Sequence, residues 1–204
     1  MIAPDASAAF VATMEDVLEV YQRPHDPERP VVCLDETSKQ LIVETRAPIP
    51  VTPGKPARHD YEYERNGVAN LFMMFAPLEG WRHVKVTDRH AAVDYAQALK
   101  ELSDTHFPGA AKIVLVQDNL STHTTASLYA AFPATEARRL VERFEWHYTP
   151  KHGSLILSPS KEARHGRIRT RRSLNTVFGS PYSRQANIVR RGCRLGEKPK
   201  RAPC

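Results

Sequence analysis

The chain has 204 residues, 41% of them hydrophobic, and carries a formal net charge of +6. This length allows one domain with a core, or one domain plus an appendage. Three cysteines, Cys33, Cys193 and Cys204, form no CxxC pair, which excludes a zinc knuckle or a CxxC redox motif. There is no signal-like segment and no apolar run long enough for a bilayer, so we expect a soluble cytoplasmic protein without a membrane partner.

The charge is divided unevenly along the chain. Residues 1–150 hold 15 Lys and Arg against 21 Asp and Glu, a net of −6, whereas residues 151–204 hold 14 against 2, a net of +12. The basic part is also poor in apolar residues. Such a segment is typical of an arm that contacts nucleic acid, or of a stretch without a fold of its own.

The first three elements follow from apolar spacing and prolines. Residues 6–24 predict a helix whose apolar face includes Phe10, Met14, Val17, Leu18 and Tyr21, and which ends at Pro24. Residues 31–37, VVCLDET, predict a short buried strand. Residues 38–64 are rich in proline and predict a loop with at most edge structure.

The rest of the acidic part alternates strands and helices. Residues 63–77 and 80–88 predict two strands joined as a hairpin, and Asp88 could cap the helix that follows. Residues 112–119, KIVLVQDN, are too apolar for an edge strand and predict a central one. Two short helices separated by Pro133, and a strand at FEWHYTP, complete a mixed α/β sheet flanked by helices.

Two acidic residues follow buried strands. If the strands of Asp35 and Asp118 are neighbours, both carboxylates emerge at the sheet edge where α/β proteins bind ligands. Their repulsion would be relieved by Mg²⁺ or Mn²⁺, which prefer oxygen ligands. Either Asp taken alone is more typical of a turn residue or a helix cap. Glu36 should point to the opposite face, and His123 is more typical of a polar loop.

Three strings carry a family resemblance: VVCLDETSKQL, VLVQDNLSTHTTASLYAAF and RFEWHYTPKHGS. They resemble the DDE transposases of the mariner-related superfamily, most of all the bacterial insertion-sequence branch called IS six-thirty. The resemblance covers about Ala3 to Ser154. It implies an RNase H-like core in which three carboxylates hold two Mg²⁺ ions that activate water and then a 3′-hydroxyl, to cut and join DNA. It makes Asp35 the first catalytic acid and Asp118 the second.

The sequence also departs from the family pattern. The N-terminal helix-turn-helix region of the family is not recognisable here. After Ser154 the expected Trp-Leu-Asn and the third acid are replaced by LILSPSKEARHGRIRTRRSL. The third acid should fall near Ser160. The nearest carboxylate, Glu162, is two positions away, which on a helix is about 200° around the axis.

These observations lead to one expected organisation. We expect an N-terminal helix and linker in residues 1–28, an RNase H-like transposase core in residues 29–154, and an irregular basic tail, disordered or frame-shifted, in residues 155–204. Metal ligands would be Asp35, Asp118 and, less favourably, Glu162, with no small-molecule cofactor. DNA contacts are expected from four residues near the start of the basic part: Lys151, His152, Arg167 and Arg169.

Three functions remain open at this stage. The favoured one is a truncated, inactive transposase that binds DNA and could form a homodimer. The second is an active RNase H-like nuclease with Glu162 or Glu36 as the third ligand. The third is a non-catalytic DNA-binding or oligomerising remnant, in which the basic tail contacts phosphates.

Overall fold

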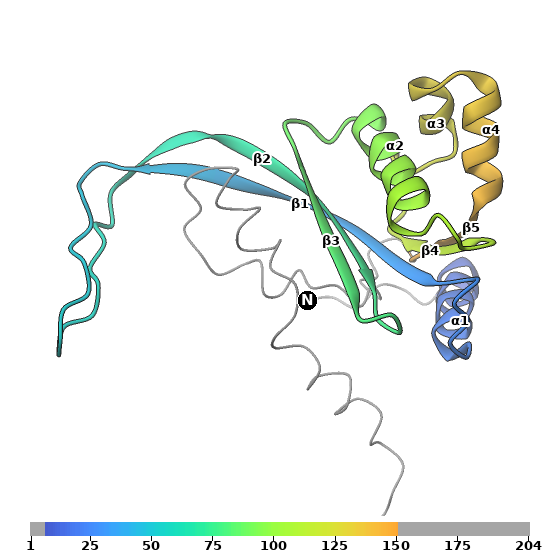
Figure 1. The fold of residues 1–204 in the computed structure, drawn as a ribbon, viewed down its shortest axis with the longest axis horizontal. Helices are drawn as coiled ribbons and strands as arrows, with labels where there is room; N and C mark the ends of the chain where they lie inside the picture. The colour runs from blue at the N-terminus through green and yellow to red at the C-terminus, as the bar shows by residue number, and fades with distance from the viewer. Residues whose placement is uncertain (1–6, 151–204) are drawn as a thin grey trace, which may run out of the picture.

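The computed structural model describes residues 7–150, and its centre is a five-stranded mixed sheet in the order β3-β2-β1-β4-β5 (Figure 1). β1 pairs with β2 and β2 with β3 in antiparallel fashion, while β4 is parallel to both β1 and β5. The strands are β1 Val31–Glu44, β2 Tyr63–Ala76, β3 Trp81–Thr87, β4 Ile113–Gln117 and β5 Phe144–Tyr148. The predicted mixed α/β sheet is therefore confirmed.

Helices cover both faces of this sheet. Figure 1 shows α2, α3 and α4 together on one side and α1 on the other. A single π-helical turn, η1, continues directly from the end of α2. The bounds are α1 Ala8–Gln22, α2 Ala92–Glu101, η1 Leu102–His106, α3 Ala126–Ala131 and α4 Ala134–Arg143. No helix within residues 7–150 is long and apolar enough to cross a membrane.

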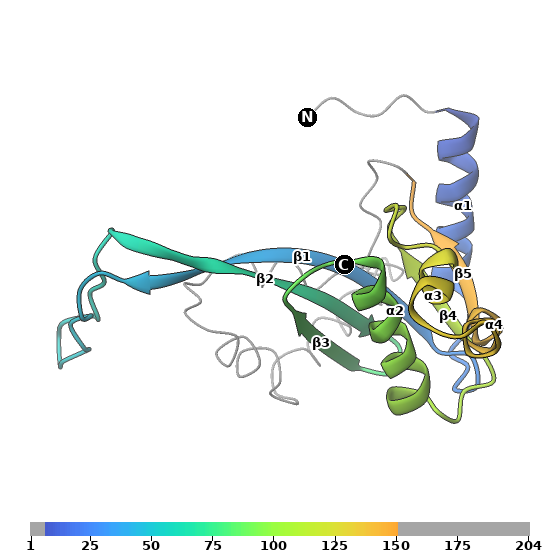
Figure 2. The same ribbon diagram turned by 90° about the horizontal axis from the view of Figure 1, so that it is seen from above.

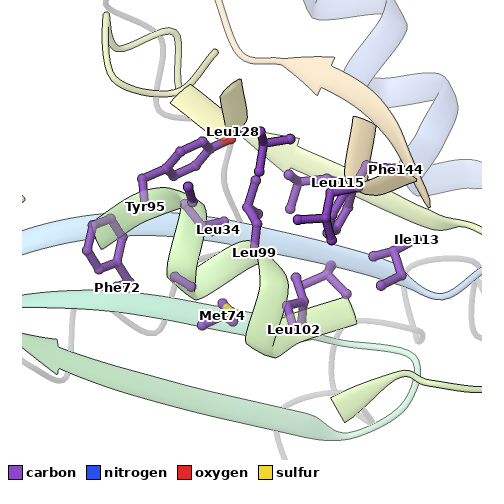
Figure 3. Packing of buried hydrophobic residues seen from close by; sticks show 14 of the residues in the cluster. Leu34, Phe72, Met74, Tyr95, Leu99, Leu102, Ile113, Leu115, Leu128 and Phe144 are labelled. Atoms are coloured by element: carbon purple, nitrogen blue, oxygen red, sulfur yellow. The ribbon is translucent and has the colours of Figure 1, made fainter. Parts of the chain in front are cut away.

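Alternation along the paired segments of β1 and β4 places their side chains in two of the three hydrophobic clusters of residues 7–150. Side chains of a strand point to opposite faces in turn. Val32 and Leu34 belong to the larger core beneath α2, α3 and α4, which includes Tyr95 and Leu115 (Figure 3). The intervening residues of β1 and β4 pack against Val17 and Val20 of α1 in a second core: Val31, Cys33, Val114 and Val116. Every residue of β4 is buried, as expected for a strand covered on both faces.

The long β1–β2 hairpin was not predicted from the sequence. Residues 38–64 were expected to form a loop, but β1 continues to Glu44 and β2 begins at Tyr63. Figure 2 shows the two strands running beyond the helices as a curved arm. The pairing of Lys39 with Ala69 and of Gln40 with Val68 extends the ladder. The prolines lie beyond it, between residues 45 and 62, so they end the hairpin and do not prevent it.

Two local predictions were wrong. The N-cap of α2 is Ala91, whose backbone N–H donates to Asp94 Oδ2 at 3.0 Å, so Asp88 does not cap the helix. In α1, Leu18 is 41% exposed and Val20 is buried instead. The helix ends at Gln22, just before Pro24, as predicted. Spacing alone identified the helix but not which of two adjacent apolar stripes would meet the sheet.

Candidate active site on the central strands

The parallel pairing of β1 and β4 brings the two predicted acids to neighbouring positions. Leu34 is the last residue of β1 in register with β4, where it lies opposite Gln117. Asp35 directly follows Leu34 in β1, and Asp118 directly follows Gln117, the last residue of β4. The prediction that their strands are neighbours is confirmed. However, β1 does not end at Asp35, because it continues in pairing with β2 after β4 has turned away.

Asp35 and Glu36, the two acids that follow Leu34, lie on opposite faces of β1. Asp35 alternates with Cys33 and therefore shares the face covered by α1, whereas Glu36 shares the face of Leu34 and α2. This agrees with the prediction that Glu36 points away from Asp35. Asp118 lies one residue beyond β4, where its side chain is 29% exposed.

His123 connects two of these carboxylates. It lies in the loop after β4, but it is fully buried and not on a polar surface. Its Nδ1 makes a short hydrogen bond with Asp118 Oδ1, and its Nε2 lies 3.4 Å from Glu36 Oε2. The second contact lacks hydrogen-bond geometry, and both atoms are buried without another partner in the described part of the chain. One imidazole ring therefore holds two acids on the α2 side of the sheet.

The position of His123 is set by a chain of contacts from α2. Its ring stacks on Tyr95, with centroids 4.5 Å apart and 22° between the planes. The Tyr95 hydroxyl donates to Gln117 Oε1 at 2.6 Å, and Gln117 Nε2 donates to the His123 carbonyl at 3.1 Å. Because each of these groups is buried and hydrogen-bonded, the loop that carries Asp118 is fixed to the core.

Electrostatics favour the charged form of this histidine. Burial by itself would lower the pKa of His123, but the hydrogen bond with Asp118 and the contact with Glu36 raise it to about 9. At neutral pH the ring is therefore an imidazolium between two carboxylates. It offsets part of the repulsion that gathering acids at this edge would otherwise cause.

Comparison with known proteins identifies the family. The model of the DDE superfamily endonucleases matches residues 30–155. This chain belongs to the DDE superfamily endonucleases. A comparison with curated proteins found no match.

Solved structures support the same fold for this DDE superfamily member. The Mos1 mariner paired-end complex with Mn has 18% identity and a TM-score of 0.51 over 94% of this chain and 60% of that one. The Mos1 transposase paired-end complex with left transposon end has 16% identity and a TM-score of 0.55, with the same coverage. The chain thus spans about 60% of the length of these structures and shares their RNase H-like fold.

Asp35 and Asp118 fit a hard divalent cation by donor type. Carboxylate oxygens are the ligands that Mg²⁺ and Mn²⁺ prefer, and Asp35 and Asp118 each directly follow a residue of the β1–β4 pairing, Leu34 and Gln117. In the described structure His123 engages Asp118 Oδ1, so an ion would have to use the other oxygen or displace this contact. Glu162, Lys151, His152, Arg167 and Arg169 lie outside the described residues.

The contacts of His123 with Asp118 and Glu36 were not predicted from the sequence. Asp118 and His123 are five positions apart, and Glu36 and Asp118 are 82 positions apart, which gives no local signal of contact. One pattern could have suggested the contacts of His123. A histidine follows Asp118-Asn119 closely, and the preceding helix carries a tyrosine, Tyr95.

Proposed function

We propose that this DDE superfamily endonuclease is the catalytic core of a transposase from the mariner-related bacterial IS six-thirty branch, acting on insertion-sequence DNA. The observation that supports the proposal is the β1–β4 register of an RNase H-like sheet, in which Leu34, the residue before Asp35, lies opposite Gln117, the residue before Asp118. The similarity to Mos1 paired-end complexes supports DNA as the partner. Such a core would work in the cytoplasm of a bacterium, where it would meet chromosomal DNA, and could act as a homodimer.

The proposed roles of the residues follow from their contacts. Asp35 and Asp118 would hold Mg²⁺ or Mn²⁺, which when bound supplies Lewis-acid activation for phosphodiester cleavage. His123 would fix the orientation of Asp118 and compensate its charge. Glu36, turned to the other face of β1, would support His123 and would not act as a ligand.

We further propose that this copy is altered after Ser154 and has little or no cleavage activity. The position expected for the third acid, near Ser160, holds no carboxylate, and Glu162 is a poor replacement. Two acids provide less negative charge for a second cation, and a two-ion displacement requires both ions. In this proposal residues 1–28 are a helix and linker, residues 29–154 the core, and residues 155–204 a basic tail.

The tail would still contribute to DNA binding. Residues 151–204, which include this tail, carry a net charge of +12 that favours contacts with phosphates, including those from Lys151, His152, Arg167 and Arg169. Such binding depends on counterion release and carries no sequence information. We therefore expect weak, sequence-independent binding that decreases as the salt concentration rises.

The first test measures the acidic site without relying on activity. Binding of Mn²⁺ to the full chain is followed by electron paramagnetic resonance, with Asp35→Asn and Asp118→Asn as the test variants. The control is Asp26→Asn, because Asp26 is an exposed acid that accepts a hydrogen bond from the Glu28 N–H. Loss of one Mn²⁺ site in both test variants but not in the control is expected. Unchanged binding in both test variants would exclude the proposed site.

The second test addresses activity. Supercoiled plasmid and terminal-repeat duplexes are incubated with the chain and Mg²⁺ or Mn²⁺, and DNA binding is measured in parallel across salt concentrations. We expect salt-sensitive binding without cleavage. Cleavage at the repeat ends that disappears in both Asp35→Asn and Asp118→Asn would show a competent third ligand and overturn the inactive assignment.

A further inference from the structure

A second cluster of histidine and carboxylate side chains lies at the edge of the sheet. His83 comes from β3, Glu101 is the last residue of α2, and His106 is the last residue of η1. Glu101 Oε1 is 3.3 Å from His83 Nε2 and 3.7 Å from His106 Nε2. One donor atom from each residue lies within 4.8 Å of the other two. Strand β3 and the continuous α2–η1 segment thus bring three potential ligands to one point.

The π turn explains how Glu101 and His106 meet. On a regular α-helix, residues five apart point about 140° away from each other. In η1 the Phe107 N–H donates to the Leu102 carbonyl at 3.0 Å, which is the five-residue repeat of a π-helix. This wider turn brings side chains five positions apart to the same side. Single π turns occur frequently at functional sites.

The surroundings resemble the environment of a metal ligand set. His106 Nε2 is buried and has no hydrogen-bond partner among the described residues. Lys85 Nζ donates to Glu101 Oε2 at 2.7 Å, which orients the carboxylate and leaves Oε1 toward the histidines. Trp81 contacts both rings, with its centroid 6.1 Å from that of His83 and 4.9 Å from that of His106.

We propose that His83, Glu101 and His106 form a binding site for a borderline divalent cation such as Zn²⁺, with the fourth position taken by water. Imidazole nitrogen and a carboxylate oxygen are ligands that Zn²⁺ accepts at about 2.0–2.2 Å, so tetrahedral donors lie roughly 3.4 Å apart. Two of the separations, 3.3 and 3.7 Å, already fit this value. The third separation, between the donor atoms of His83 and His106, is within 4.8 Å.

This site is separate in chemistry from the acidic one. Two nitrogen donors favour Zn²⁺, Co²⁺ or Ni²⁺ over the Mg²⁺ preferred by carboxylates alone. Its ligands join the edge strand β3 to the C-terminal end of α2, so a bound ion would cross-link two elements of the core. Because a ligand that binds only the folded state stabilises it, the cation should raise the unfolding temperature.

Trp81 provides a local reporter for the test. The chain has two tryptophans, Trp81 and Trp146, and Trp81 is the one that contacts His83 and His106. The full chain is titrated with Co²⁺, which quenches nearby tryptophan fluorescence, and then with Zn²⁺ as a competitor. We expect saturable quenching that Zn²⁺ reverses, together with a higher unfolding temperature in Zn²⁺. The quenching should persist in Trp146→Phe.

Variants decide whether the three residues form the site. His83→Gln, Glu101→Gln and His106→Gln should each weaken the Co²⁺ affinity tenfold or more, on the order seen when metal-site partners are lost. The control is His25→Gln. His25 pairs with Glu79 at 2.6 Å, but within residues 7–150 this pair belongs to no group of three potential metal ligands. Far-UV circular dichroism confirms that each variant is folded.

The outcomes separate this proposal from the function proposed above. Unchanged quenching in Asp35→Asn and Asp118→Asn is expected, since neither residue belongs to the cluster. Absence of saturable quenching in the wild-type chain would overturn the proposal. Equal Co²⁺ affinity in the wild type and all three glutamine variants would also overturn the proposal, because the ion would then be bound by other residues of the chain.

Discussion

The two histidine–carboxylate clusters of this chain use the same residue types in opposite proportions. In the cluster on the central strands, one histidine lies between two acids, Glu36 and Asp118. In the cluster at the sheet edge, two histidines surround one acid, which also accepts a hydrogen bond from Lys85. Both contact α2, the first through Tyr95 and the second through Glu101.

The proportion of acids decides the charge of the histidines. Asp118 and Glu36 raise the pKa of His123 to about 9 despite its burial. Burial and the neighbouring His106 instead lower the pKa of His83, and Glu101 compensates only in part. The first ring is a cation that balances acids, whereas the second keeps a neutral nitrogen with a lone pair. A histidine between two acids is thus suited to orienting them, and a pair sharing one acid is suited to binding a metal.

The largest expected effect follows from removing the charge at the central cluster. His123→Ala should lower the free energy of unfolding by about 3 kcal/mol or more, since it leaves two partly buried carboxylates without their cation. Urea unfolding at neutral pH in EDTA measures this value. In His59→Ala, where the ring is 45% exposed and 3.8 Å from Glu44, the change should stay below about 0.5 kcal/mol. Equal losses in the two variants would show that His123 does not balance the acids.

The opposite pKa directions can be measured directly. In metal-free protein, NMR titration should show His123 losing its proton near pH 9 and His83 losing its proton below the usual 6.5. The stabilisation from His123 is fully present below pH 6.5 and lost as pH rises through about 9. The contribution from His83 has the reverse sign, because its folded-state pKa is lowered. Similar pKa values for the two rings would remove the distinction between the clusters.

A smaller effect should come from the hydrogen bond that anchors the central cluster. Tyr95→Phe keeps the ring that stacks on His123 but removes the donor to Gln117 Oε1. Leaving a buried acceptor unpaired should cost about 1–3 kcal/mol, measured by thermal or urea unfolding. Tyr61→Phe is the matched control, since Tyr61 is 81% exposed. A loss in Tyr95→Phe no greater than in this control would mean that Gln117 finds another donor.

The smallest expected effect concerns Lys85 at the edge cluster. Lys85→Met removes a partly exposed ion pair with Glu101, so stability should change by less than about 1 kcal/mol. The same variant should alter Co²⁺ affinity in the Trp81 fluorescence assay, because Lys85 orients the carboxylate of Glu101. Loss of the ion pair with no change in Co²⁺ affinity would show that Lys85 does not orient the ligand.

Much of the fold could be predicted from local patterns. The apolar run before Gln117 is buried on both faces because a continuous run of this kind has no polar side to present to water. The hairpin after Ala76 and the helix break at Pro133 likewise follow from turn chemistry and from the missing proline N–H. These features depend on residues close in sequence, which is why local patterns predict them.

Tertiary structure alone decided the two clusters and the length of the arm. Glu36 meets His123 only because β1 and β4 pair in parallel with Leu34 opposite Gln117, a register that no local pattern specifies. His106 meets Glu101 through a π turn, although the helical repeat expected from the sequence would separate them. The arm extends past Asp35 because β2 offers a partner strand there, and backbone pairing outweighs the weak strand signal of residues 38–44. In each case the deciding contact joins residues that only the folded chain brings together.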